Sequence, residues 1–216
     1  MIVSASGIIL RTRPLTETSL IVHWLTPAFG RIATVAKGAR RPKSPFAGKL
    51  DLFYEADLSF SRSRRSELHT LREVKLLETR AALRSDLGWL RQAAYAAALI
   101  EQTTETDTPL AGVHDLTRAF LNALPAHPAQ PQNLFAFELK LLDELGQLPD
   151  LAKAQITAGT KFVARALIGA GDWDAVLRIK PSAAQVNELR QFLHGFLIYH
   201  LGRIPKGRAA AISGAV

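Results

Sequence analysis

The stretch from Asp51 to Ser61, DLFYEADLSFS, alternates apolar and polar residues with a strict period of two. One face would carry the apolar side chains Leu52, Tyr54, Ala56, Leu58 and Phe60. The other face would carry the polar side chains Glu55, Asp57, Ser59 and Ser61. Alternation of this length indicates an antiparallel strand with one buried and one solvated face. This part of the chain is therefore expected to belong to a sheet that covers a core on one side.

Further short strands are predicted on both sides of this one. Residues 6–12, 19–26 and 30–38 are β-branched or aliphatic runs bounded by turn residues. Residues 67–77, ELHTLREVKLL, fit either a strand or a helix. Five short antiparallel strands in about 75 residues favour a small barrel, and the five-stranded OB barrel is a common nucleic-acid-binding choice at that size.

The periodicity changes to that of helices from about residue 81. Alanine-rich residues 82–103 place Leu83, Leu87, Leu90, Ala94 and Ala97 on one helical face. Further helices are predicted at 112–124, at 133–146 with Gly146 as the C-cap, at 161–171 and at 182–202. Ser182 and Gln185 form the pattern of a capping box. The chain is therefore expected to be a multidomain β + α protein, with an OB barrel at 1–80 and an all-α helical domain at 81–216.

The positive charge of the chain is concentrated in its first part. The 216 residues carry a net charge of +8. Residues 1–80 hold 14 Lys and Arg against 7 Asp and Glu, whereas the remainder holds 13 against 12. A basic module joined to a nearly neutral one favours a polyanionic partner, nucleic acid first and an anionic membrane second. The chain has no cysteine, no signal-peptide pattern and no apolar stretch of membrane-spanning length, so we expect a cytoplasmic protein.

The most basic stretch is VAKGARRPKSPFAGKL, residues 35–50. No carboxylate occurs between Glu17 and Asp51. The cations in that interval are Arg31, Lys37, Arg40, Arg41, Lys43 and Lys49. We expect these side chains to contact phosphates, and Phe46 could stack on a base. The alternative is a solvated loop whose cations only add solubility.

A second basic cluster, SRSRRSE, follows the alternating strand. Its cations are Arg62, Arg64 and Arg65, at an expected hairpin tip, and they could extend the same phosphate track or form an exposed turn. Arg11 and Arg13, near the end of the first strand, are weaker candidates.

Sequence patterns for catalysis or cofactor binding are absent. The chain has no phosphate-binding loop of the P-loop type, no dinucleotide-binding glycine pattern, no nucleophile elbow and no zinc-protease motif. Its six histidines are scattered. We therefore expect a protein that is not an enzyme and that has no metal or cofactor. The helical aromatics Phe135, Phe137, Phe192, Phe196 and Tyr199 have core-like spacing and are expected to pack internally, with a peptide-binding groove as the alternative.

Residues 7–53 contain the succession L.E.S.IV, LT...G and VAKGARR.KS. With these motifs the stretch resembles the N-terminal domain of the RecO family of bacterial DNA repair proteins. The matching residues are Glu17, Ser19, Thr26, Gly30, Ala36, Lys37, Gly38, Ala39, Arg40, Arg41, Lys43, Ser44, Gly48, Leu50 and Phe53. The helical part is similar more loosely, through FELKLLDELGQLPDL and the closing YHLGR.

The resemblance implies a recombination mediator. RecO proteins bind single- and double-stranded DNA, anneal complementary strands, and act with RecR, and often RecF, to load RecA onto DNA coated by single-strand-binding protein, whose acidic tail they also contact. Many members hold zinc with four cysteines in the later helical region, which would be residues 150–180 here. Because this chain lacks cysteine, we expect no such site. The alternative left open by the residues alone is an OB-fold RNA-binding protein without an annealing role.

Overall fold

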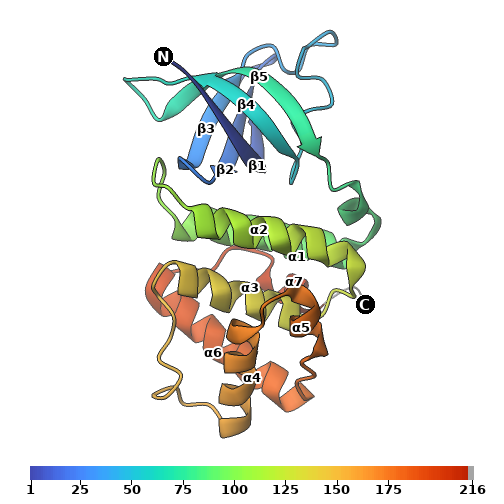
Figure 1. Ribbon diagram of the computed structural model, residues 1–216, viewed down its shortest axis with the longest axis vertical. Helices are drawn as coiled ribbons and strands as arrows, with labels where there is room; N and C mark the ends of the chain where they lie inside the picture. Colours follow the sequence, from blue (N-terminus) through green and yellow to red (C-terminus); the bar gives the residue numbers. More distant parts are fainter. Residues whose placement is uncertain (214–216) are drawn as a thin grey trace. The chain divides into compact units, whose positions relative to one another are not determined.

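The computed structural model describes residues 1–213, and they divide into two compact units (Figure 1). The first unit contains residues 1–81 together with 104–118, and the second contains residues 82–103 together with the chain from Ala119 onward. The unit that contains the barrel therefore also includes residues 104–118, which are separated from residue 81 by more than 20 positions. A domain division at residues 80 and 81 stays a proposal.

Five strands make a closed barrel in the order β1-β2-β3-β5-β4. They are β1 (Ile2–Pro14), β2 (Leu20–Thr26), β3 (Gly30–Ala36), β4 (Glu55–Ser61) and β5 (Leu68–Glu78). All neighbours pair antiparallel except β3 and β5, which pair in parallel over three residues. This is the strand order of an OB fold, as the sequence predicts. The ambiguous segment 67–77 is a strand, because it fills the position that closes the barrel.

The barrel core follows the alternation that the sequence predicts for β4, with one exception. Ala56, Leu58 and Phe60 are buried, and Asp57 is exposed. Glu55, expected on the solvent face, is buried because the Arg80 guanidinium pairs with its carboxylate. The strand begins at Glu55, so the residues from Asp51 to Tyr54 lie outside it.

The segment 104–110, which we call the strap, lies against the start of β3, before the residues that pair with β5. Its residue Thr106 forms an isolated parallel bridge with Arg31. The approach is so close that a Cβ on Gly30 would lie 1.7 Å from the carbonyl oxygen of Thr108. Because Gly30 also has φ +59°, only glycine suits this position.

The helical part contains α1 (Leu87–Thr103), α2 (Ala111–Ala123), α3 (Pro131–Glu144), α4 (Ala158–Gly169), α5 (Trp173–Arg178), α6 (Ala183–Leu201) and α7 (Arg208–Ser213). Two 3₁₀ turns, Ala81–Ser85 and Leu124–Ala126, join some of them. The face predicted for α1 is partly wrong, since Leu87 and Ala94 are exposed while Gln92 and Tyr95 are buried. Its small alanines allow close packing on several sides, so no single stripe defines its buried surface.

Side-chain hydrogen bonds hold both ends of α4, which lies within residues 150–180. The Thr157 hydroxyl caps α4 by accepting from the Thr160 N–H. Glu188 accepts hydrogen bonds from the Thr157 N–H at 2.8 Å and from the Thr157 hydroxyl at 2.7 Å. The Lys140 ammonium donates to the carbonyls of Ile168 (2.8 Å) and Ala170 (2.7 Å), at the other end of α4. Both ends of α4 are thus fixed by side chains.

The sequence predicts the start of α6 but not the presence of α7. The capping box of Ser182 and Gln185 at the start of α6 is confirmed. The six-residue α7 is not predicted from the sequence. It brings Arg208 onto the fully buried Glu138, with bonds of 2.6 and 2.8 Å, and the Tyr95 hydroxyl donates to the same carboxylate at 2.7 Å. Burial and the neighbouring carboxylate raise the pKa of the Tyr95 hydroxyl, so it stays a hydrogen-bond donor.

Two further properties concern residues 1–213 as a whole. None of their helices is long and apolar enough to cross a membrane. Within the same residues, no group of three or more histidine, aspartate or glutamate side chains is placed to hold a metal ion.

Candidate nucleic-acid interface

The basic loop between β3 and β4, residues 37–54, is an ordered chain of turns. Backbone hydrogen bonds join the Arg41 N–H to Gly38, the Ser44 N–H to Arg41, the Ala47 N–H to Ser44 and the Lys49 N–H to Phe46, at 3.0–3.1 Å. Gly38 and Gly48 have φ near +70°, which these turns require. The loop backbone is therefore a succession of hydrogen-bonded turns.

Phe46 holds this loop onto the barrel. Its side chain is only 6% exposed and belongs to the same apolar cluster as Trp24 and Phe60. The interpretation that Phe46 stacks on a base is wrong, because its ring is already used as part of the core. Of the nearest cations in the sequence, Lys43 is exposed and Lys49 is half-buried.

The basic side chains of the loop differ in their exposure. Lys37, Arg40, Arg41 and Lys43 are exposed, and Lys49 is half-buried. The Arg40 guanidinium donates to the Thr16 carbonyl at 3.0 Å, and the Arg40 N–H donates to the Thr18 carbonyl at 3.0 Å. These bonds join loop 37–54 to the β1–β2 loop, at the end of the barrel where Leu20 pairs with Ala36.

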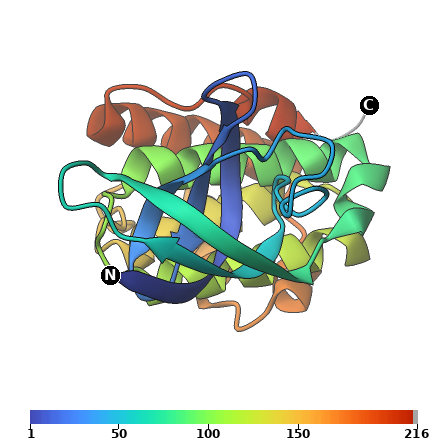
Figure 2. The same cartoon turned by 90° about the horizontal axis from the view of Figure 1, so that it is seen from above.

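The second basic cluster lies at the other end of the barrel. The Arg62 N–H donates to the Met1 carbonyl, and its guanidinium lies 6.0 Å from the Phe29 ring in the β2–β3 turn. Arg64 and Arg65 are exposed in the same β4–β5 loop. Figures 1 and 2 show this loop and loop 37–54 on opposite sides of the barrel. A single nucleic-acid strand that touches both would have to cross the barrel surface.

The outer face of β1, β2 and β3 connects the two ends. Strand register places Arg11 beside His23 and Ala33, and Arg13 beside Ile21. Both arginines are exposed. Their alternation with Thr12 in β1 is the sequence signal that places them on one face. In OB folds the face of the second and third strands, with the adjoining loops, binds oligonucleotides.

Arg31 is occupied by the strap. Its Nε donates to the Thr104 hydroxyl at 2.8 Å, and its Nη2 donates to the Thr104 carbonyl. The sequence could not indicate this contact, because the two residues lie 73 positions apart.

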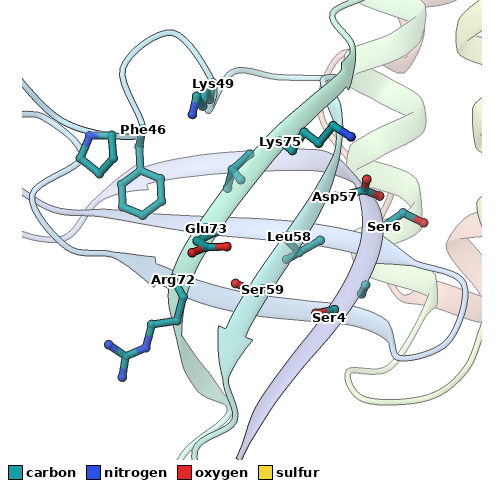
Figure 3. A pocket seen from close by; sticks show the side chains of 13 residues that line it. Ser4, Ser6, Phe46, Lys49, Asp57, Leu58, Ser59, Arg72, Glu73 and Lys75 are labelled. Carbon is teal, nitrogen blue, oxygen red and sulfur yellow. The ribbon is translucent and has the colours of Figure 1, made fainter.

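A groove of about 720 Å³ is formed by β1, β4 and β5 together with Pro45, Phe46 and Lys49 of loop 37–54 (Figure 3). Short hydroxyl side chains, Ser4, Ser6 and Ser59, line it together with Leu58. The cations Lys49, Arg72 and Lys75 are offset by the acids Asp57 and Glu73. Arg72 points away from the groove, and its Nε donates to the Ser61 hydroxyl at 2.8 Å. The groove is therefore nearly neutral and lacks the charge of the basic loops.

The chain has the features of an OB-barrel protein with an additional helical domain. These features are a closed barrel with OB strand order, basic loops at both ends of the barrel and a helical second unit. Family models match two parts of the chain. Residues 1–80 match the family described as Recombination protein O N terminal, and residues 84–161 match Recombination protein O C terminal. The chain belongs to the RecO family of DNA repair proteins.

Individual relatives match over most of the chain. DNA repair protein RecO of Anaeromyxobacter dehalogenans (strain 2CP-C) is 32% identical over 93% of this chain and 92% of its own length. DNA repair protein RecO of Symbiobacterium thermophilum is 36% identical over 74% of this chain and 62% of its own. DNA repair protein RecO of Rhodopirellula baltica is 34% identical over 66% of this chain and 53% of its own length.

Proposed function

We propose that this chain is a recombination mediator that binds single- and double-stranded DNA, anneals complementary strands and helps to load a recombinase onto DNA coated by single-strand-binding protein. The observation that carries the proposal is the anchored loop 37–54, in which the exposed cations Lys37, Arg40, Arg41 and Lys43 all precede the first carboxylate, Asp51. Such a surface neutralises phosphates without reading bases. Lowering the repulsion between two polyanions is the physical requirement for annealing them.

The proposed contact residues are Arg31, Lys37, Arg40, Arg41, Lys43, Lys49, Arg62, Arg64 and Arg65. Arg11 and Arg13 join them, because they lie on the face between the two basic loops. Arg40 has a second role in joining two loops, so Arg41 and Lys43 are the cleaner residues to change.

Binding and annealing assays test the proposal. We expect Arg41→Gln with Lys43→Gln to weaken binding of single-stranded DNA about evenly across sequences, and to slow annealing of complementary oligonucleotides. Lys153→Gln with Arg165→Gln is the matched control, since it removes two exposed cations from the helical unit. Equal affinities for the two double variants would contradict the proposal. Competition between matched DNA and RNA oligomers separates it from an RNA-binding role.

We also propose that the helical unit contacts the acidic tail of single-strand-binding protein, and that RecR, RecF and RecA are partners in the bacterial cytoplasm and nucleoid. A row of rings on α6 supports the tail contact: Phe192 lies 6.3 Å from Phe196, which lies 4.2 Å from His200. Tyr199, expected in the core, is 85% exposed. Phe196→Ala should weaken binding of an acidic peptide that ends in phenylalanine, whereas Phe162→Ala, at an exposed position on α4, should not. Equal binding by both variants would exclude this surface.

A further inference from the structure

At the end of the barrel that carries the β4–β5 loop, one carboxylate stands against two nitrogen donors. The Arg62 Nη2 lies 3.0 Å from Asp107 Oδ1, and the His69 Nε2 lies 3.9 Å from the same oxygen. Arg62 precedes the loop tip and His69 follows it, so both come from one hairpin. Asp107 comes from the strap.

His69 is a buried donor without an acceptor. Its side chain is 2% exposed, and its ring stacks on Phe60 with a centroid distance of 5.2 Å and an interplanar angle of 5°. The Ser63 N–H points at Nδ1 at 3.4 Å, which places the proton of the neutral ring on Nε2. That Nε2 has no hydrogen-bond partner among the described residues, since 3.9 Å to Asp107 exceeds hydrogen-bond range. Buried donors are normally satisfied, so this atom indicates a missing acceptor.

The strap backbone is fixed, whereas the Asp107 side chain is accessible. The Asp107 N–H donates to the Arg31 carbonyl at 3.0 Å, and Thr108 lies directly against Gly30. The Asp107 side chain is 32% exposed and the Arg62 side chain 43%. An exposed ion pair of this kind contributes little free energy, so rotation of the carboxylate away from Arg62 costs little.

We propose that Arg62 and His69 form a seat for one phosphate group of a nucleic-acid backbone, which the Asp107 carboxylate occupies when no nucleic acid is bound. The proposal rests on the proposed function and adds a specific site and its regulation to it. A backbone phosphodiester has two non-bridging oxygens, so one can accept from the arginine fork while the other accepts from the unsatisfied imidazole N–H. The stacked Phe60 ring fixes the direction of that N–H, so the seat is preorganised.

The proposal gives Asp107 a negative effect on binding. A phosphate must displace the carboxylate before it can accept from Arg62 Nη2 and His69 Nε2 together, and the displaced charge stays nearby. A nucleic acid that makes several other contacts can displace the carboxylate. A single small anion has no such contacts, so it competes less well with the carboxylate. Removing the carboxylate should therefore tighten binding and expose one more cation to phosphate.

Fluorescence anisotropy of a labelled single-stranded oligonucleotide with the full chain tests this. We expect Asp107→Asn to bind about two- to fivefold more tightly than the unaltered chain. The slope of log K against log salt should steepen by roughly 0.7, the value for one more phosphate on a single strand. Asparagine also tolerates the φ of +56° at this position. Asp115→Asn is the control, because it removes an exposed carboxylate from the same unit, away from Arg62.

The gain should disappear when Arg62→Gln is combined with Asp107→Asn. Equal affinities for the Asp107 and Asp115 variants, or a gain that persists without Arg62, would overturn the seat while leaving the proposed function intact. Absence of salt-dependent binding by the unaltered chain would overturn both. Independently, the ¹⁵N resonance of His69 Nε2 should shift on addition of oligonucleotide to the unaltered chain, and a resonance that stays in place would also refute the seat.

Discussion

Replacing Phe46 distinguishes packing of its ring in the barrel core from stacking of the ring on a base. Phe46→Ala would leave a cavity in the barrel core, because the side chain is 6% exposed and packs in the cluster of Trp24 and Phe60. Removing a buried phenylalanine ring typically costs about 3–5 kcal/mol of stability. Phe46→Leu keeps most of the volume and should cost less than about 1.5 kcal/mol. The free energy of unfolding from urea titration measures both values.

The same variants test nucleic-acid binding. A ring that stacked on a base would contribute about 1–3 kcal/mol to binding, and leucine would lose that contribution. With the ring in the core, Phe46→Leu should bind DNA as well as the unaltered chain. Phe162→Ala is the stability control, since that side chain is 73% exposed. A stable Phe46→Leu protein with at least a fivefold loss of affinity would refute our placement of the ring.

Three further predictions concern stability. Arg208→Met should cost about 3–5 kcal/mol in urea titration, because it leaves the Glu138 carboxylate buried without its cation; a cost below 1 kcal/mol would contradict this pairing. Gly30→Ala should destabilise the chain much more than Gly48→Ala, although both have positive φ, because only Gly30 lies against the strap; equal melting temperatures would show that the strap can move aside. Burial lowers the pKa of His69 in the folded chain. As pH decreases through the ordinary histidine range, the unfolded chain therefore binds a proton that the folded chain does not. The free energy of unfolding should fall over that range and recover when the pH is raised again. A pH profile that is not flattened by His69→Gln would count against that assignment.

Local pattern determined much of the fold. The barrel follows from period-two runs and the turns between them, and the start of α6 follows from Ser182 and Gln185. The sequence pattern does not predict the burial of a charged residue that pairs with a residue far away in the sequence. Glu55 is buried because of Arg80, and α7 is fixed by a buried arginine that pairs with a residue 70 positions earlier.

The candidate site shows the same limit. Charge and spacing indicated both basic loops, but they could not show that the loops lie at opposite ends of the barrel. Nothing near Arg31 or Arg62 in the sequence indicates the strap, because residues 104–107 reach them only through the fold. The sequence does not show that Phe46 is in the core, because an aromatic residue between cations has the same pattern whether its ring faces a base or the core.

The salt dependence of DNA binding tests the central claim most directly. The claim is that the barrel binds nucleic acid through phosphate contacts made by its basic loops. If about six phosphates are neutralised on a single strand, log K should fall against log salt with a slope of roughly −4. Arg41→Gln with Lys43→Gln should reduce the size of that slope by about 1.4, the value for two phosphates. A slope near zero for the unaltered chain would contradict the claim.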